Sequence, residues 1–294
     1  IQYDEDRFVQ SEILSSKKVR WIYPREVPAA RPVEKLVEEA FSRPMNSKKL
    51  EDENIESVAI IVSDNTRVHT PYLPLLVRKM ESKTDDIKIV VASGTHVVPE
   101  IDFIEKVAGR ELLAKFWYKI RNSSTQNPLS KYEFIGATSR GTDVELNKEI
   151  LECDFILSSL CVRPHYFAGW EGGAKALVPG CASPKTISKN HSLSVGNPNS
   201  KELIMRGNPL REDMNEVPTL LEKERGIEHR VIDFVPNKDD VPVLIGYGEP
   251  RATHQALADY SQSIYAVKAQ PAPLVITVAE MPLGQNFYQA LKAC

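Results

Sequence analysis

The sequence is poor in cysteine and has no long hydrophobic run. Only four cysteines occur among the 294 residues, at Cys153, Cys161, Cys181 and Cys294, and none of them forms a C-x-x-C pair. This spacing argues against a structural zinc site and a disulfide framework, and it fits the reducing cytoplasm, where we expect the protein to work. No apolar run approaches the roughly 18 residues that a membrane span needs, so we expect no membrane partner.

A strong excess of charge is also absent. The chain has 37 Lys and Arg against 40 Asp and Glu, with a formal net charge of -3 at pH 7. General nucleic-acid binders usually carry a basic face, so this balance argues against that class. The hydrophobic share of 42% and the charged share of 26% are ordinary for a folded globular protein.

Short β-branched apolar runs alternate with amphipathic segments along the chain. The predicted strands are Ser57 to Ser63, Ile87 to Ser93, Tyr132 to Ala137, Phe155 to Leu160, Arg230 to Val235, Val243 to Tyr247 and Leu274 to Ala279. The predicted helices are Val33 to Phe41, Tyr72 to Glu81, Ile101 to Val107, Val217 to Arg225 and Gln255 to Val267. Several strands lack alternation, which is typical of parallel strands covered on both sides. The pattern therefore predicts an α/β fold with a mostly parallel sheet and helices on both faces.

A Pro- and Ala-rich stretch from Lys268 to Pro273 predicts a linker. We expect an N-terminal α/β domain over residues 1–268, which carries the functional motifs. Residues 269–294 are expected to hold the linker and the first strand of a second α/β domain. The chain has no initiator Met and ends at Cys294, so we expect it to be part of a longer protein.

Polar clusters follow three of the predicted strands. They are Ser63 to Pro71, Gly94 to His96 and Cys161 to His165. Ligands of open α/β sheets bind where strands end at their carboxyl side, so the three loops are expected to converge on one crevice.

The third cluster runs into a glycine-rich segment, RPHYFAGWEGGAKALVPG, which covers Arg163 to Gly180. Glycines let backbone amides approach a bound group closely and adopt positive φ. Lys175 beside them supplies either a point charge for phosphate or an amine that can bond covalently. His165 and the later His191 add metal ligation or proton transfer. This segment predicts a ligand-binding loop.

Together, these motifs resemble the nickel-pincer-nucleotide-dependent lactate racemase family. The resemblance rests on D-x-T-R at Asp64 to Arg67, G-T-H at Gly94 to His96, P-H-Y-F-A-G-x-x-G-G-A-K at Pro164 to Lys175, P-G at Pro179-Gly180 and N-H at Asn190-His191. It implies a nickel-dependent isomerase that racemises or epimerises 2-hydroxy acids, lactate-like or larger. The implied cofactor is the nickel-pincer nucleotide, a pyridinium-3-thioamide-5-thiocarboxylic acid mononucleotide. The implied partners are a small 2-hydroxy acid and the cofactor-synthesis enzymes.

The resemblance also implies roles for individual residues. Lys175 would form the covalent link to the cofactor, and His191 would be the protein ligand to nickel. Further cofactor contacts are expected from Asp64, Thr66, Gly169, Gly172 and Gly173, and substrate contacts from Arg67, Gln285 and Tyr288. Tyr288 stands where relatives have a lysine that binds the substrate carboxylate. A neutral phenol there weakens the attraction for a small carboxylate and leaves room for a larger or differently substituted 2-hydroxy acid.

His96 and His165 would be the opposed acid/base pair of the implied reaction. One imidazole takes the hydroxyl proton as hydride leaves the α-carbon for the cofactor, and hydride then returns to the other face of the transient keto acid. One base is needed for each enantiomer, and histidine suits both directions because its pKa lies near neutrality. The planar fork of Arg67 suits a substrate carboxylate because it donates two hydrogen bonds.

Two other classes of function stay open. The first is a nucleotide-dependent oxidoreductase on a similar sheet, although no G-x-G-x-x-G follows the first predicted strand. The second is a non-catalytic protein that binds a nucleotide or a metal, although storage needs no opposed bases.

Several residues also have a purely structural interpretation. Arg67 could be a salt-bridge partner, Asp64 could cap the following helix, and His96 could cap its loop. The histidines outside the motifs are interpreted as structural or surface residues: His69, His229 and His254.

Overall fold

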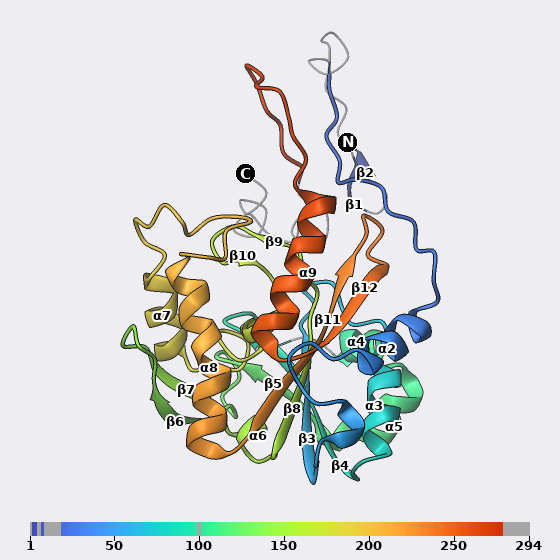
Figure 1. The fold of residues 1–294 in the computed structure, drawn as a ribbon, viewed down its shortest axis with the longest axis vertical. Coiled ribbons are helices and arrows are strands. Elements are labelled where there is room, and N and C mark those ends of the chain that lie inside the picture. Colours follow the sequence, from blue (N-terminus) through green and yellow to red (C-terminus); the bar gives the residue numbers. More distant parts are fainter. Residues whose placement is uncertain (1, 5–6, 9–18, 99–100, 279–294) are drawn as a thin grey trace.

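A six-stranded sheet forms the centre of the protein, with the strand order β12-β11-β8-β3-β4-β5. The computed structural model describes residues 2–4, 7–8, 19–98 and 101–278. The sheet strands are β3 (Ser57–Ser63), β4 (Asp86–Gly94), β5 (Ile120–Ser124), β8 (Phe155–Ser159), β11 (Glu228–Pro236) and β12 (Pro242–Gly248). All neighbours pair in parallel except β11 and β12, which form an antiparallel edge (Figure 1).

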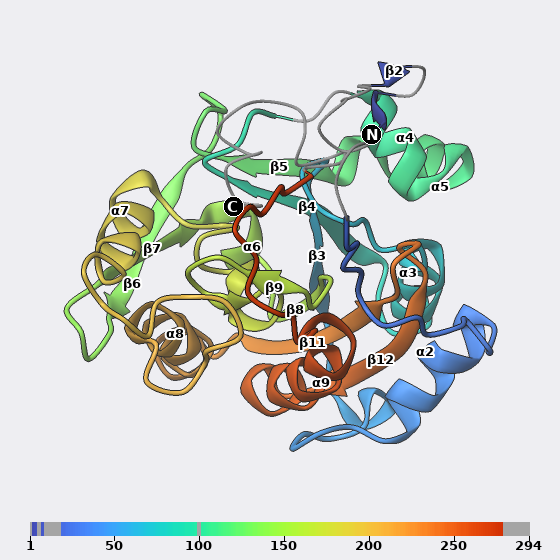
Figure 2. The same cartoon turned by 90° about the horizontal axis from the view of Figure 1, so that it is seen from above.

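Helices cover both faces of this sheet. The longer ones are α2 (Val33–Ser42), α3 (Leu73–Glu81), α4 (Ile101–Ala108), α5 (Arg110–Phe116), α7 (Pro184–Ser192), α8 (Pro209–Arg225) and α9 (Pro250–Tyr265). Figure 2 shows α3 and α8 on opposite sides of β3. The predicted α/β fold, mostly parallel with helices on both faces, is confirmed.

Alternate side chains of β3 enter two separate cores. Val58, Ile60 and Val62 pack with α2 and α3, whereas Ala59 and Ile61 pack with the elements on the other face. A strand buried on both sides has no polar face, and this explains the uninterrupted apolar run in its sequence.

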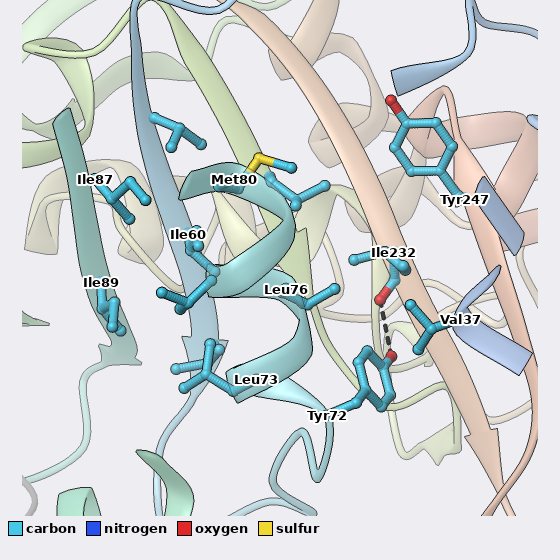
Figure 3. Packing of buried hydrophobic residues seen from close by; sticks show 14 of the residues in the cluster. Val37, Ile60, Tyr72, Leu73, Leu76, Met80, Ile87, Ile89, Ile232 and Tyr247 are labelled. Carbon is cyan, nitrogen blue, oxygen red and sulfur yellow. Dashed lines mark hydrogen bonds between the residues drawn. The ribbon is translucent and has the colours of Figure 1, made fainter. Parts of the chain in front are cut away.

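The packing of α3 shows how one of these cores is built. Its apolar residues Leu73, Leu76 and Met80 recur at helical spacing and form one buried stripe (Figure 3). The stripe faces β3 and β4. At its start, the Tyr72 hydroxyl donates a hydrogen bond to the carbonyl oxygen of Ile232 at 3.0 Å, which ties α3 to β11.

Some of the predicted elements differ from those observed. The predicted strand Tyr132 to Ala137 forms as β6, but it pairs antiparallel with β7 (Asp143–Asn147) outside the central sheet. Helix α8 begins at Pro209 rather than at Val217, because the Asn208 side chain accepts a hydrogen bond from the Arg211 N–H and caps it there.

The predicted strand Leu274 to Ala279 is not seen over residues 274–278, which have no regular secondary structure. Residues 279–294 lie outside the described part of the chain, and the division into two domains stays a prediction. Within the described ranges, no helix combines the length and the apolarity that a bilayer crossing requires.

Candidate active site

A pocket of about 390 Å³ lies where β3, β4 and β8 end. Asp64 and Arg67 follow β3, His96 follows β4, and Cys161 follows β8. The glycine-rich segment supplies His165, Glu171, Gly172 and Lys175, and helix α7 supplies His191. The three loops and the glycine-rich segment therefore meet in one pocket at the carboxyl end of the sheet.

Asp64 holds the ring of His96. Its Oδ2 lies 2.7 Å from Nδ1 of His96, and its Oδ1 accepts hydrogen bonds from the N–H and the hydroxyl of Thr66 at 3.0 and 2.7 Å. Burial disfavours the carboxylate, but the hydrogen bonds from His96 and Thr66 outweigh it and lower the pKa of Asp64. An ionised Asp64 makes Nδ1 of His96 a donor, so Nε2 of the neutral ring is an acceptor for a proton.

Arg67 forms an ion pair with Glu171 inside the pocket. Its Nε contacts Oε1 of Glu171, and the two side chains are only 17% and 14% exposed. Its Nη1 donates to the carbonyl oxygen of Thr66 at 2.9 Å. Burial disfavours the guanidinium charge, but the carboxylates of Glu171 and Asp64 outweigh it and raise the pKa of Arg67. Arg67 thus forms the salt bridge of its structural interpretation, and its contact with a substrate carboxylate stays a prediction.

His165 sits on a short hairpin and presents the opposite proton arrangement. Strand β9 (Pro164–His165) pairs with β10 (Gly169–Trp170), and Nδ1 of His165 accepts the N–H of Ala168 at 3.2 Å. Its ring stacks on Tyr166 with centroids 4.7 Å apart. Since Nδ1 is an acceptor, Nε2 of the neutral ring carries the proton and is a donor.

Lys175 and His191 reach the pocket from two anchored elements. Lys175 belongs to the 3-10 turn η3 (Gly173–Ala176), and His191 lies in the last turn of α7. The ring of His191 packs edge-on against Phe167, with centroids 5.0 Å apart. Its neighbour Asn190 is buried and donates to Asp213 of α8 at 2.8 Å. The N-H motif therefore combines a structural anchor with a pocket residue.

Residues 3–202 match the family model of the lactate racemase N-terminal domain. The chain belongs to the lactate racemase family.

Two curated relatives carry the name lactate racemase. The protein of Thermoanaerobacterium thermosaccharolyticum is 29% identical over 268 residues, and that of Lactiplantibacillus plantarum is 28% identical over 267 residues. Each alignment covers 88% of this chain and 61% of the relative. The chain thus spans less than two thirds of the length of these relatives.

Solved structures agree with this family and with the fold. The lactate racemase apoprotein from T. thermosaccharolyticum has a TM-score of 0.77 at 29% identity, over 87% of this chain and 61% of that one. A protein from Thermotoga maritima has a TM-score of 0.63 at 20% identity, over 80% of this chain and 59% of that one. The second likeness supports the fold alone.

Two of the three motif glycines serve packing rather than the pocket surface. A Cβ at Gly169 would lie 2.2 Å from the carbonyl oxygen of Ile204, and one at Gly173 would lie 2.8 Å from the ring of His254. Both glycines have positive φ, at +77° and +63°. Of the three, only Gly172 lines the pocket. Close packing alone explains why both positions are glycine. Direct contacts of Gly169 and Gly173 with the cofactor stay a prediction.

A buried arginine outside the family motifs holds the glycine-rich segment. Arg211 of α8 is completely buried. It donates to the carbonyl oxygens of Ala168 at 3.1 Å and Gly172 at 3.2 Å, and also to that of Trp170. Burial lowers the pKa of Arg211 to about 10, so the guanidinium stays charged at neutral pH. One side chain therefore fixes three backbone carbonyls of the segment.

Two further buried groups complete this support. Asp233 of β11 accepts the N–H of Gly173 at 2.6 Å, and His254 of α9 donates from Nε2 to the carbonyl oxygen of Glu171 at 2.7 Å. Burial lowers the pKa of His254 well below its usual value, so the ring is neutral. The structural interpretation of His254 is confirmed. His229 is also buried, where its Nε2 lies 2.9 Å from the Ser158 hydroxyl.

Glu171, Arg211 and Asp233 are the site residues that sequence reasoning missed. Glu171 stood at an unspecified position of the glycine-rich motif, where a lone acid between Trp170 and Gly172 was the only signal. Arg211 and Asp233 follow no motif spacing. The predicted substrate contacts Gln285 and Tyr288 lie outside the described residues.

Proposed function

We propose that this chain carries the catalytic pocket of a racemase or epimerase of 2-hydroxy acids, with lactate or a larger analogue as substrate. The observation that carries the proposal is the opposed proton arrangement of His96 and His165 in one pocket. Nε2 of the neutral His96 ring can accept a proton, whereas Nε2 of the neutral His165 ring carries a proton that it can donate. One can remove a proton while the other supplies one, and the roles reverse for the other enantiomer.

Asp64 prepares His96 to accept a proton. The carboxylate fixes the tautomer and stabilises the imidazolium that forms when Nε2 takes the hydroxyl proton of the substrate, as the buried acid of a catalytic triad does. At His165, the backbone N–H of Ala168 takes the corresponding place and holds Nδ1 as an acceptor. We propose that the pair therefore favours proton removal at His96 and proton donation at His165 in the resting state.

The pocket fits a cofactor that brings its own metal ligands. In the described part of the chain, no group of three or more His, Cys, Asp or Glu side chains is placed to hold a metal ion. His191 would supply a single imidazole ligand to nickel, and Lys175 would supply the amine that tethers the cofactor; both line the pocket. The chemistry that a bound nickel-pincer nucleotide supplies is reversible hydride acceptance. Asp64 and Gly172 border the same space, and the Thr66 hydroxyl contacts Asp64; these three residues are the proposed cofactor neighbours.

Arg67 is the proposed partner of the substrate carboxylate. Its guanidinium lines the pocket beside Glu171, close to the loop that carries His96. Gln285 and Tyr288 are proposed as further substrate contacts. Lactate is proposed as substrate because the relatives are named lactate racemase. Larger 2-hydroxy acids are proposed because position 288 is a tyrosine where relatives have a lysine.

The proposal is tested with full-length protein made together with the cofactor-synthesis enzymes. We expect one nickel per chain, a mass adduct on the peptide that contains Lys175, and loss of optical rotation from either enantiomer of lactate or a larger 2-hydroxy acid. Unmodified Lys175 without nickel or racemisation would refute the proposal. Turnover that depends on added nicotinamide dinucleotide would favour the oxidoreductase alternative instead.

A further inference from the structure

Glu171 places a carboxylate in the pocket against the residue proposed to bind the substrate. It lies between the β10 strand and Gly172, and one of its oxygens pairs with Nε of Arg67. Its other oxygen accepts the thiol hydrogen of Cys161, with the sulfur 3.1 Å away. Neither the family motif nor the proton chemistry of the histidines uses this carboxylate.

The ion pair changes what Arg67 can offer to a substrate. Nε is engaged by Glu171, and Nη1 is engaged by the carbonyl oxygen and the hydroxyl of Thr66. A guanidinium in this state has a compensated charge and two of its three nitrogens already in use. It can bind one carboxylate, but it cannot supply the excess positive charge that a dianion needs.

The other charged groups of the pocket do not restore a positive balance. Its titratable lining consists of Asp64, Arg67, His96, Cys161, His165, Tyr166, Glu171, Lys175 and His191. A covalent link at Lys175 would turn its amine into an uncharged amide-like group. Two carboxylates, Asp64 and Glu171, would then stand against the single guanidinium of Arg67.

We propose that Glu171 is a specificity-determining residue that restricts the pocket to 2-hydroxy acids with one carboxylate and an uncharged side chain. This inference rests on the proposed function and names its substrate class. A second carboxylate on the substrate would meet the Glu171 side chain, which is only 14% exposed, and like charges repel more strongly at such a partly buried site than in water. Repulsion of the wrong substrate is a common source of specificity.

The decisive variant is Glu171→Gln, which keeps the shape and removes the charge. Malate is a 2-hydroxy acid with two carboxylates. We expect kcat/KM for malate, divided by kcat/KM for lactate, to rise at least about tenfold in this variant, because no carboxylate at position 171 then compensates the charge of Arg67. If Glu171 only orients Arg67, both substrates lose activity equally and the ratio stays constant. That constant ratio would overturn the inference, as would a wild-type enzyme that prefers malate.

Two controls separate charge selectivity from folding and from total charge. Glu105→Gln removes the same charge from an exposed ion pair with Arg110 on the surface and should leave the ratio unchanged. Glu171→Ser removes the charge together with the longer side chain and should shift the ratio in the same direction as Glu171→Gln. Opposite shifts in the two Glu171 variants would contradict a charge effect.

A binding measurement distinguishes failure of this inference from failure of the proposed function. Isothermal titration, with malate and with lactate, of full-length protein made together with the cofactor-synthesis enzymes should show that Glu171→Gln gains affinity for malate relative to lactate. If the wild type racemises no 2-hydroxy acid but the variant shows this gain, the proposed function fails and the charge selectivity of Glu171 stands. If the wild type racemises lactate and neither ratio moves, the inference about Glu171 fails alone.

Discussion

Oδ2 of Asp64 lies 2.7 Å from Nδ1 of His96, and the carboxylate is almost fully buried. This contact decides which nitrogen of His96 faces the chemistry. It also gives Asp64 a defined task within the protein, in addition to the cofactor contact predicted from the family motif.

Asp64→Asn should reduce turnover strongly without removing the cofactor. An amide can present an N–H to Nδ1 and so favour the wrong tautomer of His96, which lowers kcat by about 10²- to 10⁴-fold in comparable dyads. The check is kcat for each enantiomer, measured together with the mass of the Lys175 peptide. Loss of the adduct in step with activity would show that Asp64 acts mainly on the cofactor.

Arg211→Met should destabilise the protein and impair cofactor attachment. The variant removes a buried cation and leaves three carbonyl oxygens of the glycine-rich segment without their donor, which costs about 3 kcal/mol or more. Chemical denaturation measures the free energy of unfolding. Arg206→Met on the exposed loop before α8 is the matched control and should change it little. Equal stability of the two variants would contradict the role of Arg211.

Gly169→Ala should cost more stability than Gly196→Ala. Both glycines have positive φ, at +77° and +70°, which costs an alanine about 1 kcal/mol at either position. A Cβ at Gly169 would also meet the carbonyl oxygen of Ile204 at 2.2 Å, whereas one at Gly196 has no atom within 4 Å. We expect about 2 kcal/mol of additional destabilisation at Gly169, measured by denaturation. A difference near zero would mean that the hairpin shifts freely.

Asp233 should make stability depend on pH. Burial raises the pKa of Asp233 to about 7, even though the N–H groups of Gly173 and Leu160 favour the carboxylate. The folded state therefore keeps a proton that the unfolded state loses near pH ~3.9, so stability falls as pH rises from about 4 to about 7 and then levels off. Relative to Asp233→Asn, the wild type should lose free energy of unfolding across this window. A constant difference between the two proteins from pH 4.5 to 8 would refute the shift.

Much of the fold could be predicted from local sequence, because buried parallel strands leave a clear signal. The apolar run Ser57–Ser63 became β3 with the predicted bounds. Strand β5, with the sequence IRNSS, was missed because a polar edge strand shows neither alternation nor an apolar run. Helix α7, PKTISKNHS, was missed because it has few apolar residues and depends on the Ser183 cap and on contacts with α8.

The candidate site was likewise predicted in part. Strand-end position and motif spacing predicted which loops meet, so Asp64, His96, His165, Lys175 and His191 were all placed in one pocket. The support of these residues could not be predicted, because Arg211 and Asp233 reach the glycine-rich segment only after distant elements pack. The pairing of Arg67 with Glu171 is likewise a tertiary contact that no local pattern encodes.

The most direct test of the two-histidine account uses His96→Gln and His165→Gln in cofactor-loaded, full-length protein. Optical rotation is followed from each enantiomer of lactate, or of the larger 2-hydroxy acid that the wild type turns over, while nickel content and the Lys175 adduct are measured in the same samples. The account predicts that each variant loses at least about 10²-fold in kcat from both enantiomers and keeps nickel and adduct at wild-type levels. Near-normal racemisation by either variant, or a loss of activity that merely follows a loss of cofactor, would contradict it.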